Sequence, residues 1–250
     1  MATAVESTHH LLEPERQECL HVVYVWEWPV RISHWVIFLS ILVLSFTGYY
    51  LYDPFIISRG NNVFLMGRMR FIHEVTGFVF VAAVLLRFYW FFKGNKWARW
   101  KQFILVGKER RKDLVETLKF YLFLRRKPLP QLGHNPLAGL TYTIIYVLML
   151  IEILTGLALY DYANGIGHGP LGFFAGWLSS LIGVQYVRET HFLIMLAFLA
   201  FVIHHVYSAV LYGIEHRTSG IVGSIFSGYK YSSEKELREE ALRNPDDHET

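Results

Sequence analysis

Five histidines lie within long apolar stretches of the sequence or at their ends: His34, His73, His191, His204 and His205. Ionisable side chains inside a membrane are costly, so each of them is a functional candidate. His191 and His205 are 14 residues apart, which is just under four helical turns and about 21 Å in depth on one helix face. This spacing suits two cofactors stacked across a bilayer and ligated from one helix. His204 points to roughly the opposite face, so we expect it to be an ordinary hydrogen-bonded histidine.

Each cofactor then needs a second ligand at the same depth. Since consecutive spans run in opposite directions, His73 matches the depth of His191, and His34 matches that of His205. Zinc or copper needs ligands that converge on one point, and the two pairs are too far apart for that. Two bis-histidine sites, one above the other, describe a dihaem cytochrome b. The sequence therefore predicts two haem b groups, and at least one.

Two arginines could bind the carboxylates of such haems. Arg87 lies 14 residues after His73, and Arg31 lies three residues before His34, so both would face the ligand side of their helices. Arginine binds carboxylates in a two-pronged way. The alternative for both is extension toward lipid headgroups. Gly48 and Gly77 lie on the same faces and would let a flat macrocycle approach, although ordinary helix packing explains small residues equally well.

Four apolar spans must position these side chains, at residues 32–52, 71–92, 140–160 and 191–213. Each has the length that a helix needs to cross the hydrocarbon core, and in lipid the backbone must satisfy its own hydrogen bonds. The predicted fold is all-α and integral to the membrane, a four-helix bundle that encloses haem b within a single domain, residues 1–250. The stretch 166–184 is rich in glycine, and we expect a short surface helix at about 171–182 there; the alternative is a fifth span.

An internal repeat accompanies the spans. Segments 44–53 and 152–161 both contain Thr-Gly and end in Tyr-Asp, and the following spans open with Arg70-x-x-His73 and Arg188-x-x-His191. Two similar helical hairpins are therefore expected to build the bundle.

The distribution of charge sets the orientation. Residues 93–127 carry twelve lysines and arginines against three acidic residues, and such basic loops stay in the cytoplasm. This puts the N-terminal segment 1–25, the loop 93–135 and the tail 214–250 in the cytoplasm, in a multi-pass protein of the bacterial inner membrane. The His73–His191 pair is then outer and the His34–His205 pair inner. Six tryptophans near the cytoplasmic ends of the first two spans are expected to form an interfacial belt: Trp26, Trp28, Trp35, Trp90, Trp97 and Trp100.

Composition limits the other classes. Of the 250 residues 53% are hydrophobic and only 18% charged, below the usual share of charge in soluble domains. The single cysteine, Cys19, excludes a disulfide framework, a thiolate iron–sulfur cluster and covalent haem attachment. Residues 1–20 lack the apolar core of a signal peptide. No nucleotide-binding loop or hydrolytic triad is visible, and nothing points to nucleic acid.

Two further features stay open from the residues alone. His134 and Asn135 stand in a Gly-His-Asn-Pro turn before the third span, where they could bind a quinone and supply a proton, or simply begin a helix. Glu152 lies in the middle of the third span, where it could belong to a proton path or bond across helices.

Several motifs in order along residues 21–230 resemble one family. They are Trp26-Glu-Trp-Pro-Val-Arg-Ile-Ser-His-Trp35, Gly67-Arg-Met-Arg-Phe-Ile-His73, Gly133-His-Asn-Pro136, His191 and His205-Val-Tyr207. Together they resemble the b-type cytochrome subunit of membrane-bound nickel–iron uptake hydrogenases.

The resemblance implies a periplasmic hydrogenase, with small and large subunits, that hands electrons from an iron–sulfur cluster to the outer haem. It implies that the inner haem reduces a membrane quinone near His134 and Asn135. It also implies His73 and His191 as outer ligands and His34 and His205 as inner ligands. A second interpretation is a cytochrome b subunit of another periplasmic dehydrogenase, similar to formate dehydrogenase. A third, from another class, is a haem-free membrane transporter.

Overall fold

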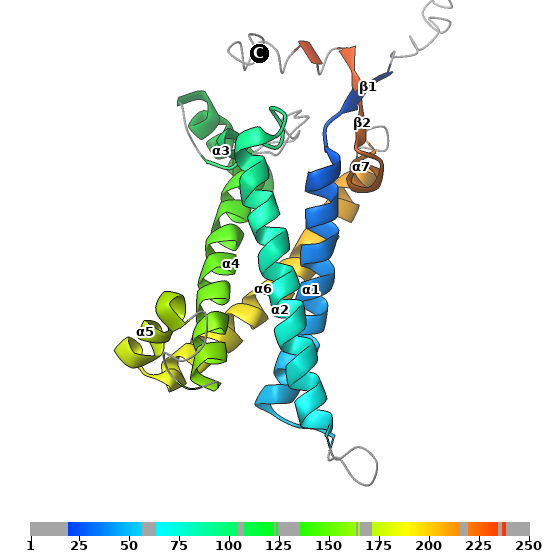
Figure 1. The fold of residues 1–250 in the computed structure, drawn as a ribbon. Coiled ribbons are helices and arrows are strands. Elements are labelled where there is room, and N and C mark those ends of the chain that lie inside the picture. The colour runs from blue at the N-terminus through cyan, green and yellow to red at the C-terminus, as the bar shows by residue number, and fades with distance from the viewer. Residues whose placement is uncertain are drawn as a thin grey trace, which may run out of the picture.

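Four long helices dominate the computed structural model, which describes residues 20–56, 64–104, 108–122, 124, 136–163, 165, 172–215, 220–234 and 237–238 (Figure 1). They are α1 (Trp28–Tyr52), α2 (Leu65–Lys93), α4 (Pro136–Ala163) and α6 (Val184–Glu215). All four are long and apolar enough to cross a membrane. The four predicted spans are therefore confirmed as helices, and the chain is an integral membrane protein.

Each helix extends beyond its predicted apolar span. α1 begins four residues before residue 32, with a proline in its first turn, where a missing N–H costs nothing. α2 begins at Leu65 and not at residue 71. Hydropathy detects only the part of a helix inside hydrocarbon, whereas the helical hydrogen bonds continue into the headgroup region, so the predicted bounds were too short.

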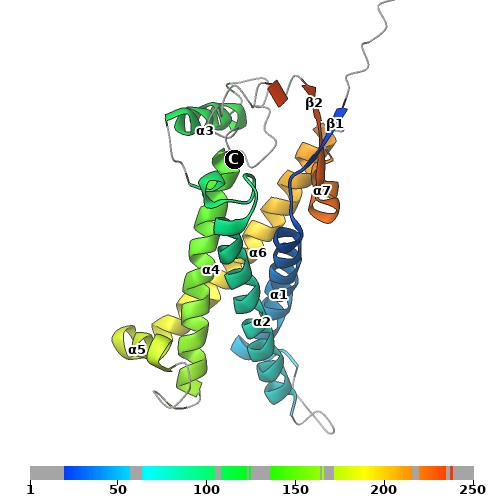
Figure 2. The same cartoon turned by 45° about the horizontal axis from the view of Figure 1, so that its top comes forward.

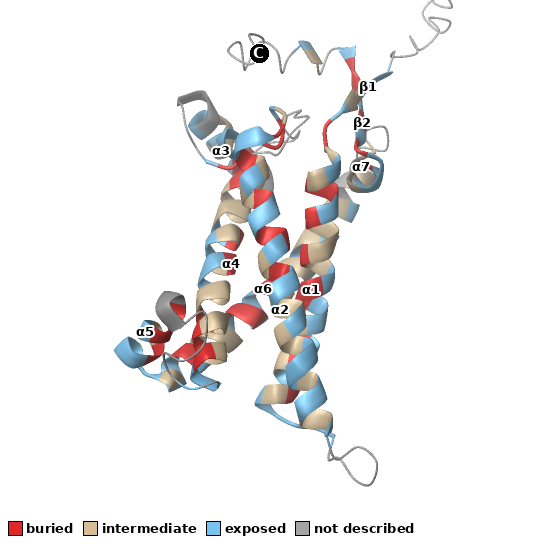
Figure 3. Cartoon of the chain, in the orientation of Figure 1, coloured by how far each residue is buried: buried red, intermediate tan, exposed pale blue. Residues whose placement is uncertain are grey.

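The core lies between the four long helices. α1 packs against α2, and α4 packs against α6. All four helices contribute to one cluster of buried apolar side chains: Ile37, Ile41, Phe80, Ala83, Val84, Ile145, Met149, Ile194 and Phe198. Figure 3 shows buried and exposed residues alternating along the long helices. The outward side chains are also apolar, Leu85 and Ile203 among them, as expected where lipid replaces water.

A short helix, α5 (Gly172–Ile182), precedes α6 and packs against α4. Its 11 residues are about 16 Å long, too short to cross a bilayer. The predicted short helix is confirmed over Gly172–Ile182, residues 166–171 lie outside the described residues, and the described part of 166–184 holds no helix long enough to be a fifth span. Gly183 joins α5 to α6 with φ of 86°, a left-handed conformation that favours glycine.

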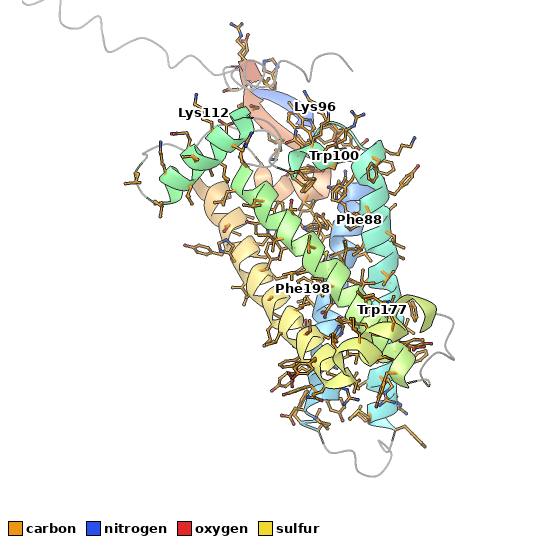
Figure 4. All side chains as sticks on the ribbon, turned by 90° about the vertical axis from the view of Figure 1, so that its left-hand side faces the viewer. Phe88, Lys96, Trp100, Lys112, Trp177 and Phe198 are labelled. Atoms are coloured by element: carbon orange, nitrogen blue, oxygen red, sulfur yellow. The ribbon has the colours of Figure 1, made fainter. Side chains whose placement is uncertain are left out.

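Basic residues gather at the end of the bundle where α1 begins. The helix α3 (Lys108–Tyr121) and the short 3₁₀ helix η3 (Trp100–Gln102) interrupt the predicted loop 93–135. In Figure 2, α3 lies across the end of α4. Figure 4 shows Lys96, Trp100 and Lys112 at this end and Trp177 of α5 toward the other. The described part of the basic loop is therefore at the same end of the molecule as His34.

The two terminal segments form a small sheet, which the all-α prediction missed. β1 (Leu20–Tyr24) pairs antiparallel with β2 (Tyr229–Ser233), with Val22 opposite Tyr231. The short helix α7 (Ile221–Ser227) leads into β2. Gly228 accepts hydrogen bonds from Val25 and Trp26 at its carbonyl and has φ of 91°. A two-stranded sheet between segments about 200 residues apart leaves no local periodic signal, because its pairing is long-range.

The predicted tryptophan belt needs a correction. Trp26 and Trp97 are buried in a second cluster with Val25, Val30 and Ala98. Trp26 donates to the Ser224 hydroxyl at 3.1 Å. Trp28, in contrast, is well exposed. A buried indole with a partner for its N–H stabilises a core, so at least these two tryptophans join the termini to the bundle and do not line a lipid interface.

Candidate functional site

Four of the predicted histidines face one another in two pairs. The ring centres of His73 on α2 and His191 on α6 are 6.3 Å apart. The ring centres of His34 on α1 and His205 on α6 are also 6.3 Å apart. The two rings of each pair are not hydrogen-bonded to each other. Each pair therefore leaves a gap of similar width between its two imidazoles.

Threonine hydroxyls hold both rings of the His73–His191 pair. Thr47 Oγ1 lies 2.9 Å from His73 Nδ1, and Thr155 Oγ1 lies 2.9 Å from His191 Nδ1. Each hydroxyl donates its own proton to a carbonyl in the preceding turn, Val43 or Ile151. Each threonine oxygen therefore accepts a hydrogen bond from Nδ1–H. The Nε2 atoms are left without protons and can bind a metal.

Glycines allow these rings to approach the neighbouring helices. A Cβ atom on Gly48 would lie 3.1 Å from Cε1 of His73, and one on Gly156 would lie 3.2 Å from Cε1 of His191. Gly48 was expected to let a macrocycle approach its helix. The structure shows that it also leaves room for the imidazole ring of His73. Gly77 has no atom within 4 Å of its Cβ position, so space remains beside it.

The second pair has different surroundings. Tyr142 Oη lies 3.3 Å from His205 Nδ1, and the His205 ring stacks on Phe201. His34 Nδ1 is buried and without a hydrogen-bond partner. Of the two adjacent histidines, His205 is the one that faces His34. His204 is exposed, and its Nε2 lies 3.5 Å from the Ser208 hydroxyl.

A cavity of about 630 Å³ surrounds the His73–His191 pair. All four long helices line it, with Gly48, Gly77 and Glu152 among its walls. Its two cationic lining residues are Arg70 and Arg188, from the repeated Arg-x-x-His motif. Its size falls in the usual range for cofactor sites, about 300–1,000 Å³.

Arg87 and Arg31 lie at the opposite end. Arg87 is only 4% exposed, donates to the Ala98 carbonyl at 3.3 and 3.4 Å, and lies over the Phe91 ring. Arg31 donates from Nη1 to the Ser227 carbonyl, and its buried Nε has no partner. Both side chains are turned inward, so neither extends toward lipid headgroups. The binding of haem carboxylates by Arg31 and Arg87 stays a prediction.

Glu152 lies beside His191, with Oε2 3.3 Å from Nδ1. His134 and Asn135, the predicted quinone residues, lie outside the described residues, directly before α4. Sequence reasoning missed Thr47, Thr155 and Tyr142 as partners of histidines. The repeated Thr-Gly pair was the available signal for the two threonines, but such pairs also occur in ordinary membrane helix packing.

The fold and the site define a class: an integral membrane protein whose helices present facing histidine pairs at two levels. The chain belongs to the prokaryotic cytochrome b561 family, whose model matches residues 25–228.

Curated relatives place it more narrowly. The chain is 37% identical over 216 residues to the probable Ni/Fe-hydrogenase B-type cytochrome subunit of Rhodobacter capsulatus, covering 83% of this chain and 81% of that one. It is 38% identical over 214 residues to the protein of the same name from Bradyrhizobium diazoefficiens, covering 82% and 85%. The probable Ni/Fe-hydrogenase 1 B-type cytochrome subunit of Escherichia coli is 32% identical over 216 residues, covering 83% and 90%. The family resemblance is confirmed, and the haem-free transporter interpretation loses its support.

Proposed function

We propose that this protein is the dihaem cytochrome b subunit of a nickel–iron hydrogenase and carries electrons from the hydrogenase to a membrane quinone. The observation that carries the proposal is the equal separation of the two histidine pairs, 6.3 Å between ring centres in each.

That separation fits one iron atom between two imidazoles. With metal–nitrogen bonds of about 2 Å, and about 1.1 Å from nitrogen to ring centre, the two centres would stand about 6.2 Å apart, close to the 6.3 Å in each pair. A bare metal ion needs further protein ligands, and the described residues contain no group of three or more histidine, cysteine or acidic side chains suited to one. Two histidines are what a haem needs, because the macrocycle supplies the other four nitrogens.

Other residues of the chain would orient the histidines and bind the haem carboxylates. Thr47 and Thr155 fix the Nε2 atoms toward the gap at the His73–His191 pair. Arg70 and Arg188 line the cavity there and would bind haem carboxylates; Arg31 and Arg87 are the corresponding proposal at the other pair. When bound, haem b supplies reversible one-electron transfer at each level.

The partner is inferred from the relatives. Their names associate them with nickel–iron hydrogenases, which favours hydrogenase small and large subunits over a formate dehydrogenase-like complex. The His73–His191 pair would receive electrons from the small subunit, as the outer site.

The orientation rests on charge. The described basic residues of 93–122 lie at the His34–His205 end of the bundle, and basic loops favour the cytoplasm. The sheet of β1 and β2 puts the two terminal segments at that same end. We therefore propose a multi-pass protein of the bacterial inner membrane with both termini in the cytoplasm.

The quinone site belongs at the same end. His134 and Asn135 directly precede Pro136, the first residue of α4, and α4 carries Tyr142 beside His205. A quinone reduced there would take electrons at the inner level and protons from the cytoplasm.

The content of haem b per chain tests the proposal, measured on purified protein by pyridine extraction and reduced-minus-oxidised spectra. Two haems per chain are expected. A single haem would refute the dihaem form and leave a monohaem cytochrome. Haem-free protein, after expression with ample haem, would overturn the proposal.

A further inference from the structure

The two halves of the repeat share their threonine and glycine contacts with the histidines but differ three residues before each threonine. Thr47 and Thr155 hold His73 and His191 in the same way, and Gly48 and Gly156 seat the same two rings. Three residues before each threonine, the first half has Leu44 and the second has Glu152. The repeat therefore contains an acidic side chain on only one of its two histidines.

That side chain is directed at His191. Glu152 Oε2 lies 3.3 Å from His191 Nδ1, and the Glu152 side chain is 15% exposed. The Oε2 atom is buried and makes no hydrogen bond. Nδ1 of His191 is thus contacted by Thr155 Oγ1 at 2.9 Å and by Glu152 Oε2 at 3.3 Å, and the Glu152 backbone carbonyl is a further hydrogen-bond acceptor for it.

A buried acidic side chain near the middle of a membrane helix is costly and rarely kept without a role. Packing alone does not require it, since leucine serves at the equivalent position 44. An oxygen acceptor on the far nitrogen of a ligand histidine fixes the ring orientation and makes the histidine a stronger electron donor to its metal. Stronger donation stabilises the oxidised iron and lowers the reduction potential.

We propose that Glu152 is a positioning residue for His191: its carboxyl group, in contact with Nδ1, strengthens electron donation by the ring and thereby lowers the potential of the haem at the His73–His191 pair. The inference rests on the proposed function, because it needs a haem at that pair. Its consequence is directional. A lowered potential at the haem that receives electrons first favours onward transfer toward the His34–His205 pair.

The test is an optical redox titration of the holoprotein, with electron paramagnetic resonance of the oxidised haems. In Glu152→Leu, which copies the first half of the repeat, one of the two haem potentials should move to a more positive value while the other stays in place. The low-spin ferric signal of that same haem should shift. Glu152→Gln retains an acceptor oxygen without the carboxylate, so its shift should have the same sign and be smaller.

Glu189→Gln is the matched control. Glu189 is exposed, lies two residues before His191 on α6 and contacts Gln185, so the control removes an acidic group at the same depth without touching the ring. It should leave both potentials unchanged. Equal shifts of the haem potential in Glu189→Gln and Glu152→Gln would mean that loss of any acidic group at this depth causes the shift. That result would overturn the inference. Should Glu152→Leu lose haem, Glu152→Gln decides: two haems with unchanged potentials and signals overturn the inference. Wild-type protein without haem would instead refute the proposed function.

Discussion

The hydroxyl of Thr47 lies 2.9 Å from Nδ1 of His73 while it donates its own proton to the Val43 carbonyl. This contact fixes which nitrogen of the imidazole carries the proton. Thr155 repeats the arrangement at His191. Rings whose tautomers are set in this way keep Nε2 unprotonated and able to bind a metal, which a bis-histidine metal site requires.

Replacement of single histidines should separate the two sites. His191→Ala and His205→Ala should each lose one haem per chain, and His191→Ala should stop hydrogen-dependent quinone reduction. His204→Ala is the control, since its ring is exposed and its Nε2 lies 3.5 Å from the Ser208 hydroxyl, and it should keep both haems. Pyridine extraction of each purified variant measures the content. Full haem content and activity in His191→Ala would show that the pairing is wrong.

Thr47→Val should weaken haem retention at one site. The change removes one of two acceptors of the half-buried His73 ring, since the Leu44 carbonyl remains, at a cost of about 0.5–1.5 kcal/mol for one hydrogen bond. Thr141→Val is matched, because Thr141 donates to the Leu137 carbonyl in the same way and is not itself a hydrogen-bond partner of His73 or His191. The measurement is the rate of haem loss to a haem acceptor in detergent. Equal rates in the two variants would contradict the role of Thr47.

A methyl group on Gly48 should disturb the seat of His73. The added Cβ would be 3.1 Å from Cε1, so the ring must move by a few tenths of an ångström. The expected result for Gly48→Ala is a shifted ferric signal of one haem in electron paramagnetic resonance. Gly67→Ala, at a position with nothing within 4 Å, should leave both signals in place. An unshifted spectrum in Gly48→Ala would mean that the His73 ring is not closely confined by position 48.

The cavity beside Gly77 gives a test of its occupant. Neither Gly77 nor Gly67 has an atom within 4 Å of its Cβ position, but only Gly77 lines the cavity. Gly77→Leu should therefore expel the haem from the His73–His191 pair, whereas Gly67→Leu should retain it. Haem content per chain distinguishes the two. Two haems retained in Gly77→Leu would exclude the cavity as the haem site.

Glu27 connects the start of α1 to the end of α2. Its Oε2 accepts from Trp90 Nε1 and from the Asn95 backbone N–H, both at 2.8 Å. Glu27→Gln should lower the free energy of unfolding by about 1–3 kcal/mol, since hydrogen bonds to a charged group are replaced by weaker ones. Glu116→Gln, in a solvated pair with Lys119, should cost about 0–1 kcal/mol. Thermal unfolding in detergent compares the two, and equal losses would contradict the connection.

The four membrane helices followed from the sequence because apolar length alone determines them: 20 apolar residues in lipid have no alternative to a helix. The spacing of 14 residues between His191 and His205 also determined that the two would share a face. The helix ends did not follow, because hydropathy detects only the part of a helix inside hydrocarbon. The burial of Trp26 did not follow either, because it depends on contacts with Ser224 of α7 and Lys230 of β2, which lie far away along the chain.

The sequence by itself determined the class of the protein: four spans, histidines at two depths, a basic end and the motifs of a cytochrome family. Only the tertiary structure decided how each histidine is held. Thr47, Tyr142 and Glu152 stand on different helices from their histidine partners, and helix rotation and crossing, which no single-helix periodicity encodes, bring them within hydrogen-bonding range. The physical reason is that a ligand's depth depends on its own helix, whereas its tautomer and electronic character depend on its neighbour.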